Sequence, residues 1–156
     1  MVDDLLLDGI NHVALLTKDT KRFVTFYQEV FGATVLDQSE LPFGTVTFVE
    51  IGGNRDLNVF EIADNSEADH QVPAFERGRI DHIGFQACSM EAFEEARRRL
   101  MARGATDGFV TDFGPVYSVF FRDPDGLECE VVVPSPDPGP ITGPGNPAPG
   151  YEVGVP

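Results

Sequence analysis

The chain has few basic residues. It contains 11 Lys and Arg against 26 Asp and Glu in 156 residues, which gives a formal net charge of −15. Nucleic acids and anionic membrane surfaces repel such a charge, so we expect neither as a partner. Lys18 and Lys21 are the two lysines, so few lysine side chains are present to bind a polyphosphate ligand.

Cysteines and long apolar runs are also scarce. Cys88 and Cys129 are the two cysteines, too few for a disulfide framework. No apolar run approaches the roughly 18 residues that span a bilayer, and no positively charged start leads into an apolar stretch as in a secretory signal. We therefore expect a cytoplasmic protein. The hydrophobic fraction of 42% is enough for a core in one domain or in two small fused modules.

The most informative stretch is Asp-Pro-Asp-Gly at 123–126, with apolar residues on both sides. Proline presets φ, aspartate can bond its own backbone and glycine tolerates φ > 0, so the stretch predicts a hairpin turn. After it, Glu128 and Glu130 alternate with Leu127, Cys129 and Val131, which places both carboxylates on one face of a strand. A carboxylate in an apolar strand needs a partner, water or a metal.

An internal repeat organises the rest of the chain. Ile-Asn-His-Val-Ala at 10–14 matches Ile-Asp-His-Ile-Gly at 80–84, at an offset of 70. Gly-Ala-Thr at 32–34 matches 104–106 at an offset of 72, because the second helical region is two residues longer. Carried forward, that offset places Asn58 opposite Glu130.

Each repeat predicts the order β-α-β-β-β and an α+β fold. The first helix begins at Asp19 or Thr20 and ends at Gly32, and the second begins after Ser89 and ends at Gly104. Strands are expected at 9–17, 34–37, 45–51, 57–62, 79–87, 109–111, 117–122 and 127–133.

These elements divide the chain into five parts. Residues 1–8 are an acidic lead-in, 9–63 the first module, 64–78 a polar linker and 79–133 the second module. Residues 134–156 contain eight prolines and five glycines, a composition that favours neither a core nor a strand ladder. We expect part of this tail to contact either a strand edge of its own domain or a second subunit.

Two histidines occupy equivalent positions in the repeats. His12 and His82 each follow a strand-opening Asn or Asp, and Glu130 lies at the equivalent end of the last strand. Two imidazoles and a carboxylate form a ligand set that leaves positions on a metal open to substrate.

The repeat, the (Asn/Asp)-His openings and the Asp-Pro-Asp-Gly-x-x-x-Glu closing resemble the vicinal oxygen chelate superfamily over about residues 9 to 133. This group includes glyoxalase I, methylmalonyl-CoA epimerase, extradiol dioxygenases, and the fosfomycin- and bleomycin-resistance proteins. The resemblance implies two βαβββ modules whose mixed sheets form a cup, with the helices on the outer face. It also implies that His12, His82 and Glu130 bind one divalent ion of Fe, Mn, Co, Ni or Zn, and that the protein is a homodimer.

The fourth ligand position departs from glyoxalase I, which has a carboxylate there. The repeat offset places Asn58 at that position, and an amide oxygen can bind a metal. Glu61 is the alternative, but it lies three residues along the strand and should point to the opposite face. Asn58 as ligand and Asn58 as bystander both stay open.

The function implied is a lyase, isomerase or epimerase step on a small α-oxo or oxygen-rich substrate, with Glu130 as metal ligand and catalytic base. One alternative is an Fe(II)-dependent dioxygenase. Phe120 stands where extradiol enzymes have a tyrosine, and His70, in the linker, is a poor candidate for their extra acid–base histidine. The other alternative is a non-enzymatic antibiotic-binding protein, for which the charge of −15 would suit a cationic drug.

Overall fold

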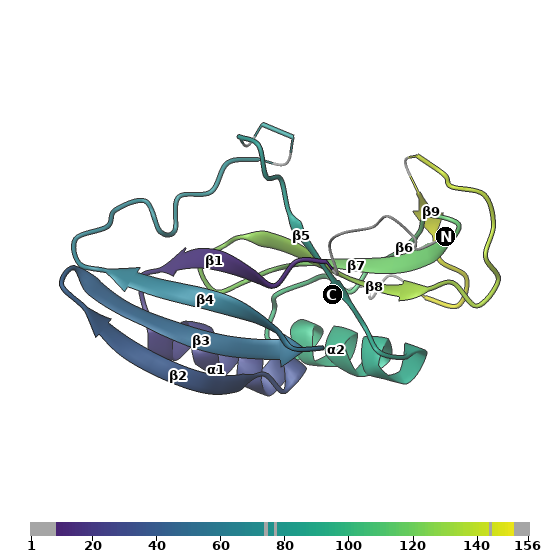
Figure 1. Cartoon of the computed structure of the whole chain (residues 1–156). Coiled ribbons are helices and arrows are strands. Elements are labelled where there is room, and N and C mark those ends of the chain that lie inside the picture. The colour runs from purple at the N-terminus through teal and green to yellow at the C-terminus, as the bar shows by residue number, and fades with distance from the viewer. Residues whose placement is uncertain (1–8, 74, 77, 144, 152–156) are drawn as a thin grey trace, which may run out of the picture. The chain divides into compact units, whose positions relative to one another are not determined.

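The first repeat builds a four-stranded mixed sheet with one helix. In a computed structural model, which describes residues 9–73, 75–76, 78–143 and 145–151, the strands are β1 (His12–Thr17), β2 (Thr34–Leu41), β3 (Gly44–Gly52) and β4 (Arg55–Ile62). Their order is β1-β4-β3-β2, with β1 parallel to β4 and the other pairs antiparallel (Figure 1). The lead-in expected at 1–8 lies outside the described residues.

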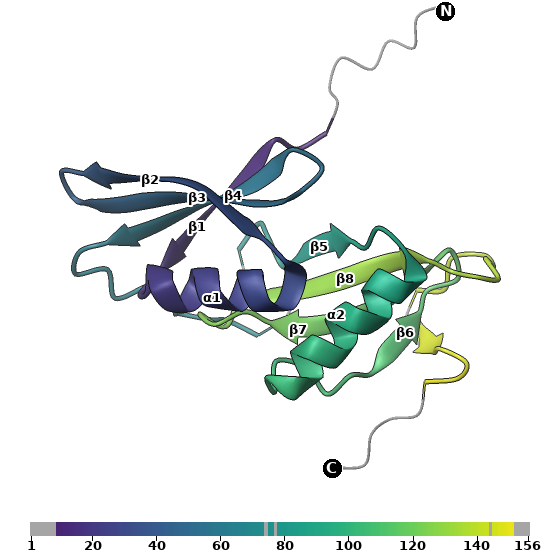
Figure 2. The same cartoon turned by 90° about the horizontal axis from the view of Figure 1, so that it is seen from below.

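Helix α1 (Thr20–Phe31) begins and ends as its sequence predicts. Asp19 is the N-cap, with its side chain accepting a hydrogen bond from the Arg22 amide, and Gly32 ends the helix in the left-handed conformation. The apolar stripe of α1 is buried against β3 and β4 (Figure 2). Buried side chains of this layer include Phe23, Phe26, Tyr27, Val49, Leu57 and Val59. The opposite face of the sheet is therefore the one without a helix.

The second repeat builds a sheet of five strands. These are β5 (Ile83–Gln86), β6 (Val110–Asp112), β7 (Val116–Arg122), β8 (Glu128–Pro134) and β9 (Asn146–Pro147), in the order β5-β8-β7-β6-β9. Helix α2 (Met90–Ala102) is capped by Ser89 and contacts β8 with its buried side chains Phe93, Ala96 and Leu100. The α+β fold class with two modules is confirmed, and the described chain divides between Ala68 and Asp69. Neither described helix has the length and apolar character needed to cross a bilayer.

The fifth strand corrects the expectation of four strands in each module. It comes from the Pro/Gly-rich tail, whose composition did not predict a strand. A two-residue edge strand tolerates proline: Pro147 lies opposite Thr111, and the Ala148 amide donates to the Val110 carbonyl. The expected contact with a strand edge of the same domain is confirmed for the described part of the tail (Figure 1); residues 152–156 lie outside the described residues.

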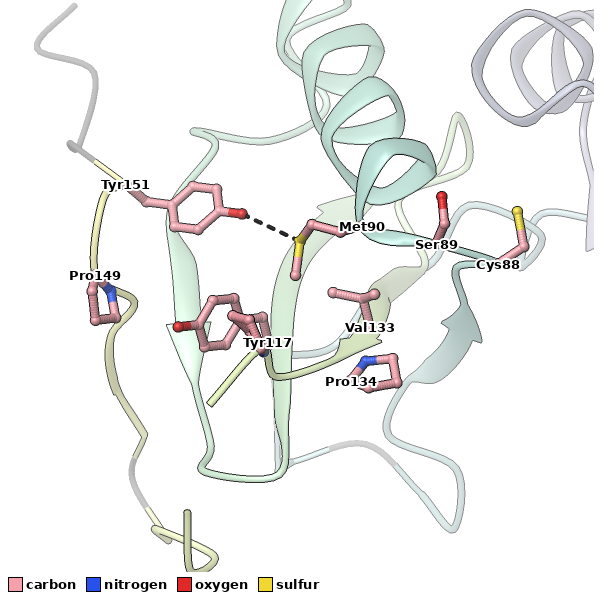
Figure 3. Close-up of a pocket in the computed structure, with 9 residues that line it drawn as sticks. Cys88, Ser89, Met90, Tyr117, Val133, Pro134, Pro149 and Tyr151 are labelled. Carbon is pink, nitrogen blue, oxygen red and sulfur yellow. Dashed lines mark hydrogen bonds between the residues drawn. The ribbon is translucent and has the colours of Figure 1, made fainter. Parts of the chain in front are cut away.

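Tyr151 fastens the tail to α2. Its hydroxyl hydrogen-bonds Glu94. The same hydroxyl lies 3.7 Å from the Met90 sulfur (Figure 3). Its ring makes edge contacts with Phe93 and Tyr117 and lies 5.2 Å from the Arg97 guanidinium carbon. Burial, followed by the hydrogen bond to Glu94, raises the pKa of Tyr151.

We expect Tyr151→Ala to lower the free energy of unfolding by about 2 kcal/mol, from lost aromatic contacts and a lost hydrogen bond. Tyr151→Phe, which keeps the ring, should cost about 1 kcal/mol. Urea unfolding measures both values, and limited proteolysis should cut the tail faster in the alanine variant. Equal unfolding and equal cleavage in all three proteins would show that Tyr151 does not fasten the tail.

Candidate functional site

The parallel strand pairs place the repeat-related residues at equivalent positions. In the first sheet Asn58 lies opposite Ala14, and in the second Glu130 lies opposite Gly84. Because alternate residues of a strand share a face, His12, Ala14 and Asn58 lie on the face of their sheet without a helix. Glu130 lies on the corresponding face of the second sheet. The offset deduced from sequence therefore holds in the register of the strands.

His82 and Glu130 face each other in the second unit. His82 Nε2 lies 3.6 Å from Glu130 Oε1, which is too long for a hydrogen bond. His82 Nδ1 lies 2.9 Å from Asp81 Oδ2. A carboxylate can only accept, so Nδ1 carries the hydrogen, and in a neutral imidazole Nε2 presents its lone pair. Two electron-rich atoms then face each other, an arrangement that a proton or a cation between them would relieve.

Asp81 is itself held by the segment that precedes it. Its Oδ1 accepts a hydrogen bond of 2.6 Å from the Phe75 amide, while its Oδ2 contacts His82. The expected strand at 79–87 is shorter, Ile83–Gln86, and residues 81 and 82 precede its ladder. The Asp-His dipeptide thus orients the imidazole from just outside the strand.

The two carboxylate oxygens of Glu130 have different neighbours. Oε2 accepts a hydrogen bond of 2.5 Å from the Ser118 hydroxyl on β7, and Oε1 faces His82. A Cβ at Gly84 would come within 3.0 Å of Oε1, so glycine at this position leaves room for the carboxylate. Phe120 lies directly across from Glu130, with its ring centroid 5.7 Å from that of His82.

The first unit repeats part of this arrangement. His12 Nδ1 lies 2.9 Å from Asn11 Oδ1, and an amide oxygen accepts from Nδ1–H as Asp81 does. Asn58 Oδ1 is buried and has no hydrogen-bond partner among the described residues. An orphaned buried carbonyl oxygen is costly, and a cation is one group that would satisfy it.

Glu61 points away from Asn58. Its Oε2 accepts a hydrogen bond of 2.8 Å from the Thr20 amide, at the N-terminus of α1. Strand alternation places Glu61 on the helix-covered face with Leu57 and Val59. There an anionic side chain satisfies a free helix amide and the positive end of the helix dipole.

The sequence did not indicate the roles of three residues that contact the candidate ligands. The sequence pattern marks Asn11 and Asp81 as strand openers, but it does not indicate that they orient the adjacent histidine. Ser118 was missed, although counting back from Glu130 across the turn places it on the same sheet face. Among the described residues, no three His, Cys, Asp or Glu side chains gather within reach of one metal ion.

Other titratable side chains near these strands and in the linker have surroundings of their own. Cys129 is buried in the core, His70 is exposed, and Glu128 lies 3.4 Å from the Arg122 guanidinium. Tyr117 packs on the helix side of its sheet. There it lines a hollow of about 490 Å³ between the start of α2 and the tail, together with Cys88, Ser89, Met90, Val133, Pro134, Pro136, Pro149 and Tyr151 (Figure 3). This hollow is separated by the sheet from the face that carries Glu130.

The turn before Glu130 has the conformation that its sequence predicts. Asp123 Oδ1 accepts hydrogen bonds from the Asp125 and Leu127 amides at 2.9 and 2.8 Å, and Gly126 has φ of 87°. Asp123 is 6% exposed. Burial raises the pKa of Asp123 to about 6, against the opposing effect of these amide bonds.

A carboxyl whose pKa is higher in the folded than in the unfolded protein favours folding when protonated. Its contribution is fully present below the unfolded pKa of 3.8 and is lost as pH rises through about 6. We therefore expect wild-type protein to lose about 2–3 kcal/mol more stability than Asp123→Asn between pH 4 and pH 7. Urea unfolding of both proteins at several pH values measures this difference. Parallel pH profiles would show that Asp123 titrates normally.

Comparisons with known proteins identify the family and the fold of the chain. A sequence model of the Glyoxalase/Bleomycin resistance protein/Dioxygenase superfamily matches residues 9–131. A glyoxylase/bleomycin resistance protein/dioxygenase domain from Frankia sp. EAN1pec is 20% identical, with a TM-score of 0.71 over 83% of this chain and 94% of that chain.

Two further structures have the same fold. A mutant of the fosfomycin resistance protein FosX from Listeria monocytogenes, complexed with Mn(II) and 1S,2S-dihydroxypropylphosphonic acid, is 20% identical, with a TM-score of 0.58 over 84% of this chain and 96% of that chain. Lactoylglutathione lyase from Agrobacterium tumefaciens is 24% identical, with a TM-score of 0.58 over 82% and 95%. The sequence match covers most of the chain, and the chain belongs to the Glyoxalase/Bleomycin resistance protein/Dioxygenase superfamily, also called the vicinal oxygen chelate superfamily.

Proposed function

We propose that the protein is a divalent-metal-dependent lyase, isomerase or epimerase acting on a small α-oxo or oxygen-rich substrate. The observation that carries this proposal is the pair His82 and Glu130, whose facing atoms are 3.6 Å apart without a hydrogen bond. Two donors that each lie about 2.0–2.2 Å from one ion are about 3–4 Å apart. His12 and Asn58 would supply the further ligands, and the orphaned Asn58 oxygen suits that role.

The residues present fit a metal of the Fe, Mn, Co, Ni or Zn group. Imidazole nitrogen with carboxylate and amide oxygen is a donor set that these ions accept. Asn11 and Asp81 hold the Nδ1 atoms of the two histidines, which is how metal-binding imidazoles are usually oriented. Fe(II), Mn(II), Co(II), Ni(II) and Zn(II) are all compatible with the set.

A bound divalent ion would polarise two neighbouring substrate oxygens and stabilise negative charge that develops on them. The side chains of the protein would transfer the proton and orient the ligands. Glu130 is the carboxylate that would take a proton from a carbon beside the substrate carbonyl and return it. Asp81 keeps the hydrogen of His82 on Nδ1. The Phe120 ring lies edge-on to His82 and donates no proton.

Phe120 weighs against the dioxygenase alternative. Extradiol ring cleavage, by resemblance, uses a tyrosine at this place, and Phe120 has no hydroxyl. The second alternative is a binding protein for a cationic drug, and the net charge of −15 favours it. By the same resemblance we propose a homodimer with a small-molecule substrate.

Metal content and oxygen uptake separate these functions. Protein purified without oxygen should contain about one divalent ion per chain and should catalyse exchange of an α-proton of an α-oxo compound in deuterated buffer, without consuming oxygen. Metal-free protein that still binds bleomycin would favour the binding protein. Oxygen consumption with a catechol would favour the dioxygenase.

A further inference from the structure

Glu130 is anchored by a neutral donor. Its carboxylate stands in a strand whose neighbours Cys129 and Val131 are buried, where an unpartnered charge is costly. Ser118 is 0% exposed, and its hydroxyl donates to Oε2 at 2.5 Å, within the range of charge-assisted O–H···O⁻ bonds. A hydroxyl satisfies one oxygen and leaves the negative charge of the carboxylate in place.

Arg122, an arginine on the same sheet face, contacts other groups than Glu130. Arg122, two residues after Phe120 on β7, donates to the Gly126 carbonyl at 3.1 Å and to Glu128 Oε2 at 3.4 Å. An arginine on Glu130 would have neutralised the group that a metal needs. The sequence instead places the arginine at the turn and the serine beside Glu130.

The first module provides an internal comparison. The repeat offset of 72 aligns Val46 with Ser118 and Asn58 with Glu130; in the ladders, Val46 lies opposite Phe60 and Ser118 opposite Val132. Valine cannot donate a hydrogen bond, and Asn58 Oδ1 has no partner among the described residues. Of the two modules, the second therefore has both the hydrogen-bond donor, Ser118, and the carboxylate, Glu130.

We infer that Ser118 is a positioning residue that makes Glu130 a one-oxygen metal ligand: its hydroxyl occupies Oε2 and leaves Oε1 to bind. This inference rests on the proposed function. Oε1 faces His82 Nε2, and Gly84 leaves the space around Oε1 open. Without the Ser118 hydroxyl, the carboxylate can rotate and offer both oxygens.

Co²⁺ titration of metal-free protein tests this role. Ser118→Ala should bind Co²⁺ about tenfold more weakly, as expected when a residue that orients a ligand is lost. Its visible Co²⁺ spectrum should weaken, since a second carboxylate oxygen raises the coordination number. Ser118→Thr keeps a hydroxyl and should restore the affinity to within about threefold of wild type.

The controls separate positioning from folding. Thr111→Val removes a buried hydroxyl directly across from Ser118 on β6 and should leave Co²⁺ affinity and spectrum unchanged. Ser118→Ala should melt like wild type without metal. Wild-type affinity and spectrum in Ser118→Ala would overturn the positioning role and leave the proposed function intact. A metal-free melting loss that accounts for the weaker binding would also overturn it. Wild-type protein that binds no Co²⁺ would overturn both.

Discussion

Replacing Glu130 with glutamine is expected to lower the affinity for a divalent ion by more than 100-fold. Glutamine keeps the size of the side chain but removes the negative charge that offsets the charge of the metal. Loss of a residue that only orients a ligand costs roughly 10–100-fold, and loss of a charged ligand should exceed that. Asn58→Ala, which removes a neutral oxygen, should cost about tenfold.

Two glutamates serve as matched controls for this comparison. Glu128 lies on the same face of β8 and pairs with Arg122, and Glu61 caps α1 through the Thr20 amide. Glu128→Gln and Glu61→Gln should both bind metal like wild type. Competition titration with a coloured chelator measures all four variants. Should Glu61→Gln lose the metal while Asn58→Ala keeps it, the ligand set would be the His/Glu/His/Glu set that resembles glyoxalase I.

Phe93→Ala should destabilise the protein by about 3–5 kcal/mol, as large-to-small changes at buried aromatic sites do. Phe93 is 0% exposed, and its ring contacts Tyr151 edge-on. The substitution therefore opens a cavity under α2 and removes a surface on which the tail packs. Urea unfolding measures the loss.

Phe75→Ala is the control for Phe93→Ala, because Phe75 is 91% exposed. It should change the free energy of unfolding by less than about 0.5 kcal/mol. Equal losses in the two variants would mean that α2 is not packed on its sheet as described.

The sequence predicted the modules well because their elements carry local signals. Asp19 and Ser89 are the N-caps, Gly32 is the left-handed terminator, and the Asp123 turn joins β7 to β8 as a hairpin. The repeat offset predicted which residues share a position in the two sheets. That prediction depends only on strand periodicity and on counting, and the ladders Ala14–Asn58 and Gly84–Glu130 agree with it.

Features that depend on distant contacts were not predictable in the same way. No local pattern marks Asn146–Pro147 as a strand, because it is held by the edge of β6 and by the docking of Tyr151. The link from the Phe75 amide to Asp81 joins an irregular segment to a strand opening. The hydrogen bond from Ser118 to Glu130 depends on the register of β7 against β8, and the sequence predicts that register only approximately.

Equilibrium metal binding to the purified chain tests the central claim most directly. Metal-free wild-type protein dialysed against Mn²⁺, Co²⁺ or Zn²⁺ is predicted to bind one ion per chain. The double variant His82→Ala/Glu130→Gln, with an unchanged metal-free melt, is predicted to bind none. An ion retained by that double variant, or no ion bound by wild type, would contradict the account.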